Sequence, residues 1–122
     1  MKKILLVALL SSLVSAAYSQ TDTLTTDKIA AYVDKQVIVK GMVAGARRFE
    51  SGERAPLLLI NLDEAYPNTP LTVVLYKEVL EKATIDEASL TGKKIVASGK
   101  ISVYKGRNQL VIEKLEDLKI GN

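Results

Sequence analysis

The last third of the chain carries the pattern that most constrains its fold. From Ile95 to Tyr104, small and apolar side chains alternate with a second, more polar set, which is the period of a strand with one buried face. Turn-forming residues follow at 105–108, and a second β-prone run covers 109–112. This pattern predicts a β-hairpin with one long strand, one short strand and a cationic tip.

The first residues have the layout of a secretory signal peptide. Lys2 and Lys3 precede a short apolar stretch, and small residues follow up to Ser19. We predict a signal peptide over 1–19 with cleavage before Gln20, and cleavage before Tyr18 is the alternative. The apolar stretch is too short to span a bilayer comfortably. We therefore expect an exported protein, periplasmic or secreted, with no transmembrane segment in its mature form.

Removal of the signal peptide changes the charge of the protein. The full sequence has 17 basic and 14 acidic residues, and the loss of Lys2 and Lys3 leaves 15 against 14, a net charge of +1. A nearly neutral protein does not bind polyanions over its whole surface, because such binding needs many neutralised phosphates. Any anion site must therefore be local. The sequence contains no cysteine, which excludes a disulfide and a lipid-modified cysteine anchor.

Three further β-prone runs precede the hairpin. The first begins near Val37 and contains Gly41 and Gly45, which suit a strand that bends or bulges to wrap a barrel. Residues 20–26 are polar and are expected to form a flexible leader. The predicted elements are, in order, a helix at 27–33, a strand from Val37, strands at 57–62 and 71–76, a helix at 77–82 and the two strands of the hairpin.

Three strands, a helix and two more strands follow the order of the OB-fold, a five-stranded Greek-key barrel. We therefore predict an all-β domain with two short helices, an OB-fold barrel over 27–120. The sequence also resembles small secreted bacterial OB-fold proteins of the nucleic-acid-binding or tRNA anticodon-binding-like kind. The resemblance lies in the opening at 27–41, in Leu59-Ile60-Asn61-Leu62 with Tyr66-Pro67-Asn68 and Leu71-Thr72-Val73-Val74, and in the closing hairpin from Gly99 to Ile112. The chain departs from these proteins at Asp34 and at Asp63 or Glu64, where glycine is usual.

The composition argues against an enzyme. The sequence has no histidine and no cysteine, which removes imidazole acid–base catalysis, thiol nucleophiles and the usual zinc sites. Asp63 and Glu64 are adjacent acids near a strand end, and we interpret them as solvated turn residues. A divalent-ion contact is the alternative, but the sequence supplies too few oxygen ligands around them. We expect no catalytic site, no metal and no cofactor.

The arginines indicate where a ligand would bind. Three of the four lie between the first two strands and the fourth at the hairpin tip, the two loops that flank the ligand face in OB-folds. A guanidinium can hold a phosphate or carboxylate through two hydrogen bonds, and aromatic rings can stack on bases. The alternative is that Glu50 and Glu53 simply neutralise their arginine neighbours. The candidate ligand-binding residues are Arg47, Arg48, Phe49, Arg54, Tyr104, Lys105 and Arg107.

Two functional hypotheses remain open. The first is a non-enzymatic envelope protein that binds single-stranded nucleic acid, or another anionic oligomer, through the face between these two loops. The second is an envelope interaction or stress-response module that contacts a protein or a small ligand and binds no nucleic acid. The arginine placement favours the first hypothesis. The charge of the mature chain, its predicted export and its few aromatic residues favour the second.

Overall fold

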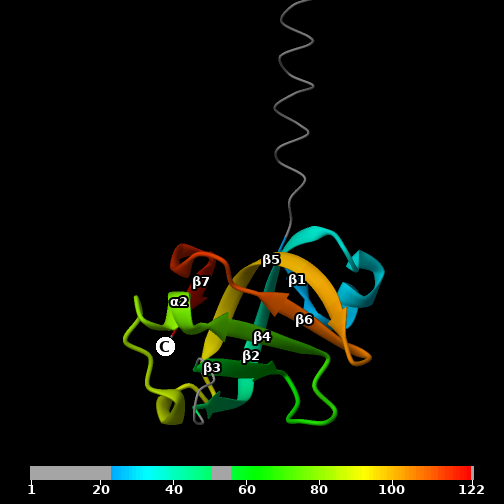
Figure 1. The fold of residues 1–122 in the computed structure, drawn as a ribbon. Coiled ribbons are helices and arrows are strands. Elements are labelled where there is room, and N and C mark those ends of the chain that lie inside the picture. Colours follow the sequence, from blue (N-terminus) through cyan, green and yellow to red (C-terminus); the bar gives the residue numbers. More distant parts are fainter. Residues whose placement is uncertain (1–22, 51–55, 122) are drawn as a thin grey trace, which may run out of the picture.

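The strands form one sheet that curls until it closes on itself (Figure 1). The computed structural model describes residues 23–50 and 56–121. The strand order is β1-β2-β3-β4-β6-β5-β7, and an additional pairing of β2 with β5 closes the ring. The strands are β1 Thr23–Thr25, β2 Gln36–Phe49, β3 Leu57–Leu62, β4 Leu71–Tyr76, β5 Lys94–Tyr104, β6 Arg107–Val111 and β7 Leu118–Ile120.

The closed ring consists of β2, β3, β4, β6 and β5. Its neighbouring strands are antiparallel except β4 and β6, which are parallel. This is the five-stranded barrel that the sequence predicts, and the all-β class is confirmed. β1 adds to the barrel parallel to β2, and β7 adds antiparallel to β5. The helical segments are short: η1 Thr26–Tyr32, α2 Lys77–Leu80, η2 Glu87–Ser89 and η3 Leu115–Asp117.

The first barrel strand is longer than the sequence indicates. β2 pairs with β5 through Met42 and then with β3 from Val43 to Phe49, and its register shifts between Val43 and Gly45. The expected bulge is therefore present. Residues 47–49, expected in a connector, are instead the last residues of the strand, because they pair with 57–59 of β3 despite their polar composition.

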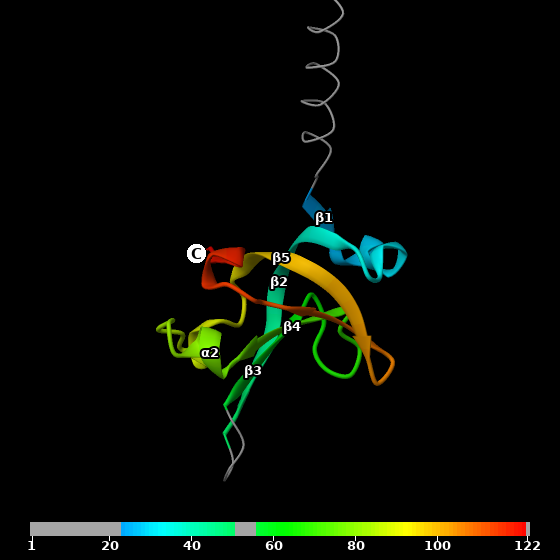
Figure 2. The ribbon, with the colours of Figure 1, turned by 45° about the horizontal axis from the view of Figure 1, so that its top comes forward.

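The core fills the barrel from alternate residues of each strand. Ile95, Ala97 and Ile101 of β5 are almost fully buried, as the alternating pattern predicts. Val103 continues that pattern but is 53% exposed. The hairpin formed by β5 and β6 projects past the rest of the barrel (Figure 2). A buried set from all five barrel strands, which includes Leu58, forms one continuous cluster. Burial of this cluster is the main favourable contribution to folding.

The predicted signal peptide lies outside the described residues, as do residues 20–22 of the expected leader. The remainder of that leader has regular structure: Thr23–Thr25 form β1, and Thr26 is buried at the start of η1. No helix among the described residues is long and apolar enough to cross a membrane.

Two aspartates occupy backbone positions that favour glycine. Asp34 and Asp63 have φ angles of 68° and 66°, in the left-handed region that aspartate tolerates better than most residues. The resemblance implies glycine at Asp34 and at Asp63 or Glu64. Asp34 and Asp63 therefore adopt turn conformations that glycine adopts most easily.

Asp63 is more than a solvated turn residue. Its Oδ2 accepts a hydrogen bond from the Thr26 hydroxyl, and its Oδ1 accepts one from the Met42 N–H at 3.0 Å. The carboxylate thus joins η1 to β2, and both of its oxygens have protein partners. Among residues 23–50 and 56–121, no group of three or more acidic, histidine or cysteine side chains could hold a metal ion.

Candidate functional site

The outward side of β2, β3, β4 and β6 presents a continuous face in three cross-strand rows. Paired residues of neighbouring strands point to the same side of a sheet, so the registers define each row. The first row is polar: Asn61, Thr72, Gln109 and Ser102. The second is Arg47, Leu59, Val74 and Val111, and the third is Phe49, Leu57 and Tyr76.

The polar row has an ordered centre. The Thr72 hydroxyl donates a hydrogen bond of 2.9 Å to Asn61 Oδ1, which fixes the orientation of that side-chain amide. The NH₂ group of Asn61 and the side-chain amide of Gln109 can donate hydrogen bonds to a ligand. Thr72 and Val74 are buried between their neighbours, so the floor of the face is smooth and well packed.

One corner of the face is formed by the end of β2. Arg47 and Phe49 lie on the same side of this strand, and the Arg47 Cζ is 5.6 Å from the centroid of the Phe49 ring. Phe49 is 44% exposed, and Tyr76, in the same row, is 53% exposed. Tyr76 is not among the seven residues predicted from the sequence to bind a ligand. Its place two residues after Val74 in β4 is the signal that would have found it.

The opposite corner is formed by the β5–β6 hairpin and residues 66–70. Lys105 Nζ lies 5.3 Å from the centroid of the Tyr104 ring, and Arg107 Cζ lies 4.3 Å from that of Tyr66. Arg107 Nη1 also donates a hydrogen bond of 3.1 Å to the Pro67 carbonyl. A hollow of about 360 Å³ lies between the tip and the loop, lined by Pro67, Thr69, Pro70, Lys105, Gly106, Arg107 and Asn108.

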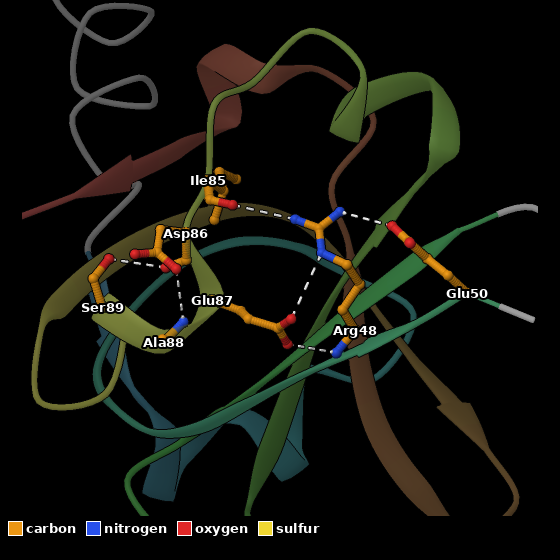
Figure 3. Close-up of polar contacts among 7 residues, drawn as sticks. All are labelled: Arg48, Glu50, Ile85, Asp86, Glu87, Ala88 and Ser89. Carbon is orange, nitrogen blue, oxygen red and sulfur yellow. Dashed lines mark hydrogen bonds and ion pairs between the residues drawn. The ribbon is translucent and has the colours of Figure 1, made fainter.

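Arg48 points away from this face. It pairs with the buried Leu58, and its side chain turns over the end of the barrel toward the loop after α2 (Figure 3). Nη2 donates a hydrogen bond of 3.2 Å to the Ile85 carbonyl, and Nε lies 3.9 Å from Glu87 Oε1. The Arg48 N–H donates to Glu87 Oε2 at 2.9 Å, and Nη1 lies 3.5 Å from Glu50 Oε1. Arg48 therefore ties β2 to η2, and we leave it out of the candidate site.

The structure thus divides the predicted residues into two groups. Tyr104, Lys105 and Arg107 lie together at one corner, and Arg47 and Phe49 at the other; Arg54 lies outside the described residues. From Arg107 to the row of Arg47 is four residues of β6, about 13 Å along the strand, and β4 and β3 lie between β6 and β2 on this side of the barrel. The two arginines cannot hold one phosphate. They are placed for a ligand that crosses the face.

The charge of the face is of one sign. None of the strand residues in the three rows is aspartate or glutamate. Arg47, Lys105 and Arg107 also take no part in the ion pairs found among the described residues, which involve Arg48 and Lys77. An anion could therefore approach these three cations without breaking an ion pair of the described residues.

The sequence matches no protein-family model and no curated protein. Among solved structures it is similar to a "putative aspartyl-tRNA synthetase" from Leishmania major Friedlin, with a TM-score of 0.53 and 10% identity. The similarity covers 83% of this chain and 21% of that chain, so this chain spans about a fifth of the synthetase. The likeness shows the fold alone.

A second solved structure is a "putative nucleic acid-binding lipoprotein" from Klebsiella pneumoniae. It is 15% identical, and the match covers 88% of this chain and 97% of that chain. Its TM-score is 0.45, too low to add an argument.

Proposed function

We propose that this protein is a non-catalytic OB-like binding module that holds single-stranded nucleic acid across the outward face of β2, β3, β4 and β6. The observation that carries the proposal is the pairing of cations with exposed aromatic rings at both ends of three strand rows that contain no aspartate or glutamate. Single-strand binding sites combine these two elements, because cations attract phosphates and rings stack on bases.

Each corner has a distinct role in the proposal. Arg47 contacts a phosphate at one end, beside Phe49 and Tyr76 as stacking surfaces. Arg107 and Lys105 contact phosphates at the other end, beside Tyr66 and Tyr104. The polar row between the corners offers amide groups to base edges, and the apolar row supports the sugars. Bases in an OB-fold commonly lie over such a face.

The binding should be modest and sensitive to salt. Three cations are available on the described part of the face, and the slope of log K against log salt is about −0.7 per neutralised phosphate for single strands. Stacking contributes about 1–3 kcal/mol per base. Affinity at low salt should therefore exceed affinity at physiological salt. The contribution of the rings should remain when the salt concentration is raised.

The test is a fluorescence anisotropy titration of labelled 15-nucleotide DNA and RNA single strands at two salt concentrations. Arg47→Ala and Arg107→Ala should each weaken binding about tenfold at low salt and reduce the salt slope by about 0.7. Lys82→Ala removes an equal charge from an exposed loop position away from the face, and should leave the slope unchanged. Phe49→Ala should weaken binding at both salt concentrations by a similar factor.

Absence of binding at low salt, or equal effects of Lys82→Ala and Arg107→Ala, would contradict the proposal. Equal affinity for a sulfated polysaccharide, with no effect of Phe49→Ala, would mean that charge alone is recognised. That outcome would replace nucleic acid by a general anionic oligomer.

We also infer that the protein is exported, from the signal-peptide pattern of residues 1–19. The N-terminal residue of protein recovered from the source cell tests this. Gln20 or Tyr18 at the N-terminus would support export. An intact Met1 on soluble cytoplasmic material would overturn it, together with the charge argument that depends on it.

A further inference from the structure

A second hollow lies on a different part of the barrel wall, where β1, β2, β5 and β7 run side by side. Its volume is about 570 Å³, within the range of about 300–1,000 Å³ typical of small-molecule sites. None of the residues of the nucleic-acid face lines it. The lining residues are Thr25, Lys40, Gly41, Met42, Asp63, Lys94, Ile95, Val96, Lys119, Ile120 and Gly121.

The registers explain the shape of this hollow. Lys40 pairs with Val96, and Val96 pairs with Lys119, so the two lysines flank the valine in one row. They are two strand spacings apart, about 10 Å between backbones. In the adjacent row Met42 pairs with Lys94, and Gly121, bonded through its N–H to the Lys94 carbonyl, supplies no side chain. A Cβ at Gly121 would lie 3.1 Å from the Lys94 carbonyl oxygen.

The floor of the hollow is apolar and accessible. Met42 is 45% exposed, and Val96, in the adjacent row, is half-buried. Ile120 lines the edge of the hollow, but it pairs with the buried Ile95 and therefore points to the other side of the sheet from Val96. Large apolar side chains exposed in a concave site favour an apolar ligand group.

The rim of the hollow carries three lysines that form no ion pair with the described residues. Lys40, Lys94 and Lys119 are exposed, and none of them belongs to an ion pair within residues 23–50 and 56–121. Asp63 lines the hollow, but its two oxygens accept hydrogen bonds from Thr26 and Met42. Three ammonium groups around an apolar floor match a ligand with one anionic head and an apolar tail.

We propose that this hollow binds a small amphipathic anion, whose aliphatic or aromatic tail lies over Met42 and Val96. Its carboxylate or sulfonate accepts hydrogen bonds from the lysines at the rim. The proposal does not depend on nucleic-acid binding, since the two faces share no residue.

The experiment uses 8-anilinonaphthalene-1-sulfonate as the probe and measures its fluorescence with the purified protein. We expect saturable binding at one site per chain and displacement by decanoate but not by decanol. Lys40→Gln together with Lys119→Gln should weaken binding about tenfold, and Met42→Asp should abolish it. Lys100→Gln is the matched control, because Lys100 is an exposed residue of β5 outside the hollow.

Three outcomes would overturn the proposal. The first is equal binding by the Lys40→Gln/Lys119→Gln and Lys100→Gln variants. The second is equal displacement by decanol and decanoate, because the head group would then play no part. The third is a dimer, seen by sedimentation, that Met42→Asp converts to a monomer while neither form binds the probe; the hollow would then be an interface between two copies. Circular dichroism checks that each variant is folded.

Discussion

The guanidinium of Arg107 joins the β5–β6 hairpin to the loop between β3 and β4. Its Cζ is 4.3 Å from the centroid of the Tyr66 ring, and its Nη1 donates a hydrogen bond of 3.1 Å to the Pro67 carbonyl. Forty residues separate Arg107 from Pro67 in the sequence. Tyr66 is 65% exposed, so the ring orients the cation while its own surface remains open to a ligand. The pair places an aromatic surface and a guanidinium at one point of the proposed binding face.

The first prediction concerns this pair. Tyr66→Ala should weaken oligonucleotide binding by about tenfold, because it removes a stacking surface and frees Arg107 to move. Tyr66→Phe keeps the ring and should bind within about twofold of the unchanged protein, since the hydroxyl has no assigned role in stacking. Anisotropy titration measures both variants. A similar loss with Phe and with Ala would show that the ring surface is not what the ligand contacts.

The second prediction separates Arg48 from Arg47. Arg48→Ala removes the bond to the Ile85 carbonyl and the contact with Glu87, and should lower the free energy of unfolding by about 1–2 kcal/mol. Arg47→Ala changes an exposed position and should alter stability by less than about 0.5 kcal/mol. Urea denaturation measures both effects. Arg48→Ala should leave oligonucleotide affinity unchanged at temperatures where it is folded. A loss of affinity as large as that of Arg47→Ala would return Arg48 to the site.

The contrast between these two arginines shows why the candidate site could be only partly predicted. Adjacent residues of a strand point to opposite sides, but the polar composition of 47–49 suggested a connector, where no such alternation holds. Pairing with β3 extends β2 through Phe49, and that pairing is a tertiary effect. The sequence therefore indicated that Arg47 and Arg48 are neighbours, but it did not show that only Arg47 faces outward.

The fold could be predicted from the sequence more completely than the site. The runs at 57–62 and 71–76 coincide with β3 and β4, because continuous apolar runs bounded by turn residues have few alternatives to a buried strand. At the hairpin, only Lys105 and Gly106 form the turn, both with positive φ, and Arg107 already belongs to β6. A two-residue turn of this kind matches the twist of the paired strands. β1 was missed because this strand of three residues, two of them threonine, gains its structure by pairing with β2.

The third prediction concerns the start of the domain. The Thr25 hydroxyl donates a hydrogen bond to Asp27 Oδ1, and this bond holds the pKa of the Asp27 carboxyl below its usual value of 3.8. Thr25→Val should raise that pKa toward the usual value, as measured by carboxyl chemical shifts in an NMR titration, and Thr23→Val should not. A carboxyl group whose pKa is lower in the folded state than in the unfolded state stabilises the protein at pH values above the usual pKa of 3.8. This stabilisation is lost as the pH falls through the folded-state pKa. An unchanged Asp27 pKa in Thr25→Val would contradict this account.

The fourth prediction tests the closure of the barrel. Gly99 lies in β5 where the strand leaves β2 and begins to pair with β6. A Cβ at Gly99 would lie 2.9 Å from Leu110 Cδ2 and 3.2 Å from the Val111 carbonyl oxygen. Leu110 is fully buried, so neither it nor the backbone of β6 can give way freely. Gly99→Ala should therefore lower the free energy of unfolding by about 1–3 kcal/mol.

Gly45 provides the control for Gly99. It lies in the bulge of β2, and a Cβ there would meet nothing within 4 Å. Gly45→Ala should change stability by less than about 1 kcal/mol in either direction, since the methyl group meets no obstacle and the unfolded chain loses some freedom. Urea denaturation of the two variants compares a strand glycine whose added methyl group would press on Leu110 with a strand glycine whose added methyl group would contact nothing. Equal destabilisation by both substitutions would contradict this account. The barrel would then need glycine at both positions for its backbone flexibility, and not at Gly99 for its close contact with Leu110.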